Sequence, residues 1–197
     1  MKKIVSLLFF ALVLVSAQEY LPLDQLPWNT LVANNIGNSG TSEFWKVDKD
    51  GPSTIISAYP VRPNSITKVT FYLVNGNSFI IGCGKGGNLS TMPNTVVGYR
   101  PNSVGYRVPF GTKLINGDSD DYATPANAGD TVSMTIDLRP FKNTVAFAKN
   151  GIDMGIASMG LNYWGRDIYI MVNLWAKGGR IKVTNYEVTT WPARHDN

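Results

Sequence analysis

The residue types that most often carry out catalysis are sparse in this sequence. His195 is the only histidine and lies close to the C-terminus, and Cys83 is the only cysteine. A serine or cysteine nucleophile needs a histidine held in a pocket, which a chain terminus rarely provides. One cysteine and one histidine cannot form the usual four-ligand zinc site. The glutamates after the first residues, Glu19, Glu43 and Glu187, are too scattered to suggest the facing acid pair of a glycosidase. We therefore expect a protein that is not an enzyme.

Two further stretches could bind ions, but neither has the spacing that a known site requires. Asp118, Asp120 and Asp121 offer oxygen ligands for Ca²⁺, without the ligand spacing or the closing glutamate of an EF-hand. A solvated acidic loop is the favoured interpretation, and calcium binding there stays open. The glycine-rich residues 82–87 lack the phosphate-loop pattern and are predicted to connect two strands. We predict no metal and no cofactor.

Aromatic and arginine side chains in loops are the candidates for contacting a partner, because these types dominate binding energy at interfaces. Three such groups occur, and they comprise Tyr99, Arg100, Tyr106 and Arg107, then Tyr163, Trp164 and Arg166, then Trp175 and Lys177. We favour Tyr163, Trp164 and Arg166 as the ligand-binding residues, with Tyr106 and Arg107 as further candidates. Trp175 ends an apolar run and is predicted to belong to the core.

The first residues have the three-part pattern of a secretory signal peptide. Positive residues precede an apolar run from Ile4 to Val15, which is short for a membrane span, and small residues end at Ala17. We expect cleavage after Ala17 and a secreted chain with a net charge near +2, since two of the four net charges lie in the removed peptide. So small a charge does not suggest nucleic-acid binding. Asn88 begins the only N-glycosylation sequon, as suits a surface loop of a secreted protein.

Period-two alternation of apolar and polar residues predicts an all-β fold. It occurs in residues 66–74 and 131–138, and again in residues 145–156 on both sides of Asn150-Gly151. Residues 75–77 are predicted to close a hairpin between the first of these strands and residues 78–83. Residues 167–175 are apolar on both faces, which indicates a central strand covered on both sides.

Cys83 cannot form a bridge within the chain, so we expect a buried thiol rather than a disulfide between chains. The predicted organisation is a signal peptide (residues 1–17), an extended segment packing on the domain (18–42), one sandwich domain (43–191) and a polar tail (192–197). Trp28 and the Phe44-Trp45 pair are the expected anchors of the N-terminal region.

An ordered set of short motifs between residues 98 and 155 resembles the SPRY family, called B30.2 in its longer form. The motifs are Gly98-Tyr99-Arg100, Asn116-Gly117 with Tyr122, Gly129-Asp130-Thr131-Val132, Ile136-Asp137, Val145-Ala146-Phe147-Ala148-Lys149-Asn150-Gly151 and Asp153-Met154-Gly155. The resemblance implies a bent antiparallel β-sandwich of the concanavalin-like jelly-roll type. It also implies a non-catalytic module that binds proteins, usually short peptides, through loops at one end.

Two functions follow from these observations as hypotheses. The first is a secreted SPRY-like module that recognises a protein or peptide through aromatic and arginine side chains in loops. The alternative is a secreted lectin-like module that stacks a sugar on Trp164 or Tyr163, with Asp118 and Asp120 nearby.

Overall fold

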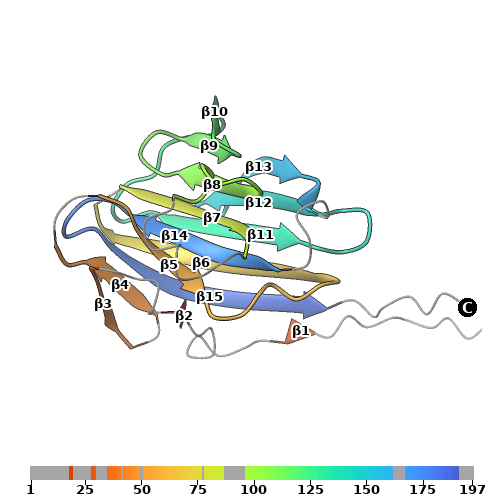
Figure 1. Cartoon of the computed structure of the whole chain (residues 1–197), viewed down its shortest axis with the longest axis horizontal. Coiled ribbons are helices and arrows are strands. Elements are labelled where there is room, and N and C mark those ends of the chain that lie inside the picture. The colour runs from red at the N-terminus through yellow and green to blue at the C-terminus, as the bar shows by residue number, and fades with distance from the viewer. Residues whose placement is uncertain are drawn as a thin grey trace, which may run out of the picture.

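Two antiparallel β-sheets face each other in the computed structural model of the chain (Figure 1). The structure describes residues 18–19, 28–29, 35–40, 42–48, 51–76, 78–86, 96–161 and 167–190. The eight-stranded sheet has the order β13 (Ile152–Met159), β12 (Thr144–Lys149), β11 (Thr131–Asp137), β6 (Ser65–Asn75), β15 (Arg180–Thr190), β4 (Glu43–Lys46) and β3 (Ile36–Ser39), and β1 (Gln18–Glu19) pairs with β15. The seven-stranded sheet has the order β10 (Asp118–Asp121), β9 (Thr112–Ile115), β8 (Ser103–Arg107), β7 (Phe79–Lys85), β14 (Ile168–Leu174), β5 (Ser53–Ser57) and β2 (Trp28–Asn29).

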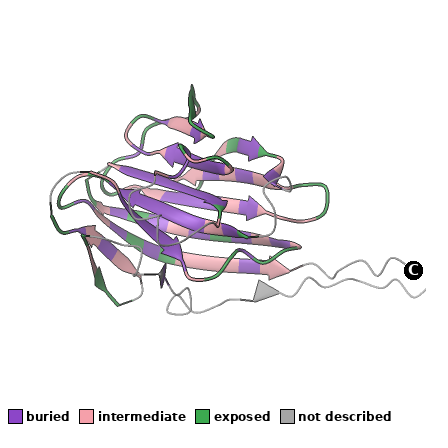
Figure 2. Cartoon of the chain, in the orientation of Figure 1, coloured by how far each residue is buried: buried purple, intermediate pink, exposed green. Residues whose placement is uncertain are grey.

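The core lies between the two sheets and is built by the alternation of side chains along each strand (Figure 2). In β6 the side chains of Val69, Phe71 and Leu73 are buried, whereas Lys68 and Tyr72 are exposed. The neighbouring β11 follows the same alternation and pairs with β6 in register. Because each strand buries one face, the alternation read from the sequence predicts both strands correctly.

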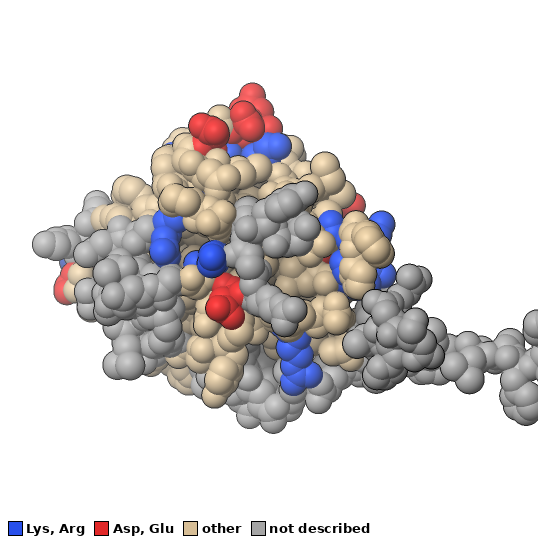
Figure 3. Space-filling view, turned by 45° about the vertical axis from the view of Figure 1, so that its right-hand side comes forward, with Lys and Arg blue, Asp and Glu red and all other residues tan. Residues whose placement is uncertain are grey.

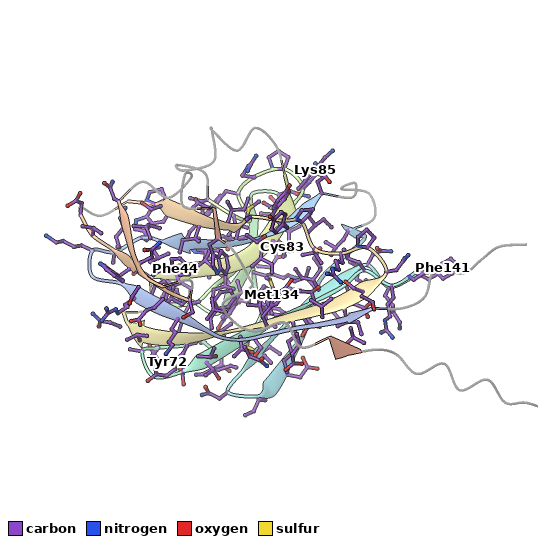
Figure 4. The ribbon with its side chains drawn as sticks, turned by 90° about the horizontal axis from the view of Figure 1, so that it is seen from below. Phe44, Tyr72, Cys83, Lys85, Met134 and Phe141 are labelled. Carbon is purple, nitrogen blue, oxygen red and sulfur yellow. The ribbon has the colours of Figure 1, made fainter. Side chains whose placement is uncertain are left out.

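The predicted central strand is also confirmed. β14 lies between β7 and β5, so its Met171 packs in a cluster on the outer face while Ile170 packs in the core between the sheets. Cys83 on the adjacent β7 is fully buried and points into the core, as Figure 4 shows. Burial raises the pKa of the Cys83 thiol well above its usual value, so the group is a neutral, packed side chain as expected.

The hairpin predicted at residues 75–77 is wrong. β6 belongs to the eight-stranded sheet, where it pairs with β11 and β15, whereas β7 pairs with β14 and β8 in the other sheet. The turn therefore carries the chain from one sheet to the other. Gly76 adopts a φ of +75°, which glycine tolerates best, but a tight turn does not require that its flanking strands pair.

The hairpin at Asn150-Gly151 is confirmed. Lys149 pairs with Ile152, so the loop between β12 and β13 has only two residues. Asn150 has a φ of +51° and Gly151 one of +80°, which is the conformation that a type I′ turn requires. The Asn150 side chain also caps the start of β11, because its Oδ1 accepts the Thr131 N–H at 2.8 Å.

β13 is an edge strand, and its apolar side chains do not continue the core. Ile152 is 73% exposed and Ile156 is 55% exposed, although the sequence pattern placed them on a buried face. Gly155 within the same strand has a φ of +85°, and a Cβ there would meet no atom within 4 Å. The backbone conformation, rather than a close approach of another chain segment, is thus the reason for glycine at this position.

The N-terminal region contributes short strands to both sheets. β1 and β3 join the eight-stranded sheet, and β2 pairs with β5 of the other sheet. Trp28 and Phe44 are buried with ring centroids 5.5 Å apart in an edge-to-face arrangement, and Phe71 lies 6.4 Å from Trp28. Trp28 and Phe44 therefore anchor this region, as expected.

The acidic residues 118–121 form β10, an edge strand, rather than the predicted loop. β10 pairs with β9 through a turn at Asn116-Gly117, and all four of its side chains are exposed. Figure 3 shows these acidic groups at the top of the molecule. Within the described residues, no three histidine, cysteine, aspartate or glutamate side chains are grouped so that they could hold a metal ion.

Candidate ligand-binding cleft

A cleft of about 770 Å³ opens at the end of the sandwich where β7 begins and where β8 and β14 end. Four segments line it, namely residues 78–80, the turn at residues 96–99, residues 107–110 and residues 173–175. The cleft is on the outer face of the seven-stranded sheet, because Ile80, Arg107 and Asn173 alternate along their strands with side chains that point into the core. Phe79 of the core also reaches the cleft.

The floor of the cleft is a row of paired residues on three adjacent strands. Arg107 pairs with Ile80, and Ile80 pairs with Asn173, so the three side chains share one face. Asn173 is fully buried. Its Oδ1 accepts the N–H of Val97 at 2.7 Å, and its Nδ2 donates to Thr54 Oγ1 at 2.6 Å. Asn173 thereby ties the turn at residues 96–99 to the floor.

The turn that carries Tyr99 depends on glycine at position 98. Gly98 has a φ of +87°, and a Cβ on it would lie 2.4 Å from the Cβ of Leu114. Its N–H donates to Ser103 Oγ at 2.9 Å. Val97 is buried by this arrangement, whereas Tyr99 is 47% exposed at the cleft. The turn therefore holds an aromatic side chain at the opening without burying it.

The opposite wall consists of a tight turn after β8. The carbonyl oxygen of Arg107 accepts the N–H groups of Phe110 at 3.2 Å and Gly111 at 3.0 Å. Gly111 packs so closely on the neighbouring chain that a Cβ would lie 2.0 Å from the carbonyl oxygen of Ala123. The guanidinium carbon of Arg107 lies 4.4 Å from the centroid of the Phe110 ring, a cation–π contact.

Hydrogen bonds also hold the backbone of Trp175 in place. Its N–H donates to the carbonyl of Ser78 at 3.0 Å, and its carbonyl accepts the N–H of Gly51 at 3.0 Å. Further along, the N–H of Gly178 donates to the carbonyl of Lys46 at 3.1 Å. The indole remains 43% exposed although its backbone is fixed on both sides. Tyr99 and Trp175 thus border the cleft from preorganised positions, and the exposed ring of Phe110 lines its opposite wall.

The described residues that line the cleft are mostly apolar. Among the described residues that line the cleft there is no aspartate, glutamate, histidine or cysteine. Arg107 is the one lining residue among them that carries a charge at neutral pH. Arginine stays protonated and cannot act as a general base. The cleft therefore offers apolar contact area, the three exposed aromatic rings of Tyr99, Phe110 and Trp175, and one cation.

Tyr106, predicted from the sequence as a ligand-binding residue, is fully buried instead. Its hydroxyl donates to the carbonyl of Thr124 at 2.6 Å, and its ring lies 5.6 Å from that of Phe147. Burial, with smaller contributions from Tyr122 and Asp130, raises the pKa of Tyr106 to about 12. The prediction fails because Tyr106 is on the inner face of β8.

Arg107, the neighbour of Tyr106 in the same prediction, points outward and lines the cleft. Trp175 was predicted to belong to the core, but its side chain is exposed at the cleft. A period-two count from Asn173, a polar residue in an otherwise apolar strand, would have placed Trp175 on the outer face.

The favoured site residues Tyr163, Trp164 and Arg166 lie outside the described residues, and so does Asn88. The described residues that flank the first group are Leu161 and Asp167. Both lie at the end of the sandwich opposite to the cleft. The N–H of Leu161 donates to the carbonyl of Asn143, just before β12, and the carbonyl of Asp167 accepts the N–H of Gly86, just after β7. Ligand contact by the favoured residues stays a prediction.

No model of a known protein family matches the sequence, and no curated protein matches it by sequence. Solved structures do match the fold. The SPRY domain of human HERC1 superimposes with a TM-score of 0.65 at 17% identity, covering 80% of this chain and 97% of that domain. Another human SPRY domain matches with a TM-score of 0.62 at 16% identity, covering 76% of this chain and 94% of that domain.

The PSpry domain of TRIM65 matches with a TM-score of 0.61 at 15% identity, covering 81% of this chain and 92% of that domain. Identities this low establish the fold alone, and the chain has the fold of SPRY domains, a β-sandwich, as its sequence motifs indicated. None of the described segments forms a helix of the length and apolarity that a membrane crossing needs.

Proposed function

We propose that this chain is a non-catalytic interaction module that holds an extended segment of a partner protein in the cleft between Tyr99 and Trp175. The observation that carries the proposal is the pair of exposed aromatic side chains on backbone that is already fixed by hydrogen bonds. Tyrosine and tryptophan are over-represented among the residues that dominate binding energy. A preorganised site also spends less of that energy on ordering its own loops.

The size of the cleft agrees with a short peptide segment. Clefts of about 300–1,000 Å³ typically enclose small ligands or a few side chains of a partner, and this one measures about 770 Å³. Its walls are largely apolar, so the segment would contribute at least one aliphatic or aromatic side chain. Truncating a single aromatic anchor at such a site typically costs about 2 kcal/mol or more, which is a loss of about 30-fold in affinity.

We also propose that the module is secreted. The three-part pattern of residues 1–17 supports secretion, and the buried position of the only cysteine leaves a fold that does not depend on disulfides. Expression in a secreting cell line should release a chain whose first residue is Gln18. A chain retained in the cytosol with Met1 intact would contradict this part of the proposal.

The site can be tested by selecting binders from a displayed library of random twelve-residue peptides. Selected peptides would then be measured against the wild type and Trp175→Ala, with Phe141→Ala and Trp164→Ala as comparisons. Phe141 is 95% exposed in the turn after β11, at the end of the sandwich away from the cleft, so it is a matched exposed aromatic (Figure 4). Thermal unfolding of each variant controls for stability.

We expect Trp175→Ala to weaken binding by about 30-fold or more, and Phe141→Ala to leave it unchanged. Loss of binding in Trp164→Ala with an unaffected Trp175→Ala would move the site to the residues favoured by the sequence. An absence of peptide binders, together with strong competable binding on a glycan array that Trp164→Ala abolishes, would replace this function with the lectin-like one.

A further inference from the structure

We infer that the partner segment presents a carboxylate side chain to Arg107, beside the apolar side chain that occupies the cleft. The inference rests on the proposed function, because it names the chemistry of a ligand for that same cleft. It assigns the partner an acidic residue, aspartate or glutamate, within a few positions of an aliphatic or aromatic one.

The first observation is the environment of Arg107. Its side chain is half-buried and stacks on Phe110, with 4.4 Å between the guanidinium carbon and the ring centroid. No carboxylate of the described residues forms an ion pair with it. A guanidinium group in contact with an aromatic ring can still offer its N–H donors to a carboxylate.

The second observation is that the same molecule shows this arrangement completed elsewhere. The guanidinium carbon of Arg180 lies 5.0 Å from the centroid of the Trp45 ring, and its Nε is 2.7 Å from Oε1 of Glu43. Arg180 thus has both an aromatic face and a carboxylate. Among the described residues Arg107 has only the aromatic partner Phe110, at the opening of an apolar cleft, and a ligand would supply the carboxylate.

Charge and polarity favour a carboxylate over a phosphate. Arg107 is the one charged residue among the described residues lining the cleft, so none of these residues carries a negative charge that would repel an anion. One arginine can neutralise a carboxylate by two parallel hydrogen bonds. A phosphate carries about −1.5 to −2 charges, so part of its charge would remain unpaired next to apolar walls. The geometry therefore fits aspartate or glutamate better than a phosphorylated residue.

The experiment compares library selections against the wild type, Arg107→Lys and Arg107→Gln. We expect wild-type binders to be enriched in aspartate or glutamate at a fixed spacing from an apolar residue, and Arg107→Gln binders to keep only the apolar preference. One selected peptide is then synthesised with its acidic residue, with the corresponding amide and with phosphoserine in its place.

The amide peptide should bind wild type about 10-fold or more weakly, and Arg107→Gln should lose a similar factor for the acidic peptide. Combining both changes should cost little more than either one, which marks a direct pair. Arg107→Lys should bind with intermediate affinity because it keeps the charge without the bidentate geometry.

Peptides that bind wild type and fail to bind Trp175→Ala, but show no acidic preference, would overturn this inference and leave the proposed function standing. The absence of any binder that depends on Trp175 would instead remove the proposed function itself. A phosphoserine peptide that binds about 10-fold tighter than the acidic one would contradict the assignment of a carboxylate.

Discussion

Asn173 supports both the fold and the cleft, so replacing it by alanine should be severely destabilising. The side chain is fully buried, accepts the Val97 N–H at 2.7 Å and donates to Thr54 Oγ1 at 2.6 Å. Asn173→Ala removes both hydrogen bonds at once, so the Val97 N–H and the Thr54 hydroxyl each lose this partner. A buried polar group left without a hydrogen bond costs about 1–3 kcal/mol, so the two together give about 2–6 kcal/mol.

Urea denaturation measures this loss directly. With a slope of about 2 kcal/mol/M, the unfolding midpoint should fall by about 1–3 M while the slope stays constant. Asn38→Ala is the matched control, because Asn38 is an exposed asparagine in the edge strand β3 and should change stability by less than about 0.5 kcal/mol. Thr54→Val removes one of the two contacts and should fall between them.

A second measurement locates the effect. Hydrogen exchange at the Val97 amide should become faster in Asn173→Ala than in Thr54→Val when both are compared under native conditions. The reasoning would be refuted if the midpoint of Asn173→Ala stayed within about 0.3 M of the Asn38→Ala control. Should Asn173→Ala fail to fold, an unchanged midpoint for Thr54→Val would refute it equally.

Three further predictions concern residues away from the cleft surface. Tyr106→Phe should leave peptide binding unchanged but lower the free energy of unfolding by about 1 kcal/mol, because it loses one buried hydrogen bond; a loss of affinity with unchanged stability would return Tyr106 to the ligand site. The Cys83 thiol should react with a thiol reagent only after unfolding, since it is fully buried, and rapid labelling of the native protein would contradict its position. Hydrogen bonds from the Asn127 backbone N–H and the Asn150 side chain lower the pKa of Asp130, so its contribution to stability is complete above about pH 4 and declines as the pH falls through the lowered value. Asp130→Asn should therefore show a smaller decrease in stability on acidification, and an identical acid profile for both proteins would exclude this role.

The strands could be predicted from the sequence because burial of one face leaves a periodic signature in neighbouring residues. Val69, Phe71 and Leu73 alternate with polar positions and are buried in β6. The turn at Asn150-Gly151 was equally accessible, since its conformation is set by two adjacent residues. Both features depend on local interactions alone.

Pairing partners could not be read locally. β6 and β7 are joined by a short turn, yet β6 pairs with β11 and β15, and β7 pairs with β8 and β14. The position of an apolar strand in its sheet, central or at the edge, also depends on residues far away in the sequence. Ile152 and Ile156 continue an apolar pattern, but among the described strands β13 lies at the edge of its sheet and both side chains are exposed. Strand pairing and strand position are therefore not visible in the pattern of neighbouring residues.

The cleft was only partly predictable for a related reason. Its residues come from four separate segments, and only the fold brings Arg107 next to Ile80 and Asn173. Tyr106 and Arg107 are adjacent in the sequence, but the face that each occupies depends on the phase of β8. Aromatic and arginine composition identified the right kind of residue, and the strand phase determined which of them can meet a ligand.

The most direct test of the central claim is an NMR titration of the ¹⁵N-labelled chain with a peptide selected for binding. If the cleft is the site, the largest shift changes should fall at the amides of residues 96–99, 107, 108, 110 and 175 and at the indole N–H of Trp175. Residues around Phe141 and Ile156 should stay unchanged. Shift changes concentrated in those two regions, with the cleft unaffected, would contradict the claim that the cleft holds the partner.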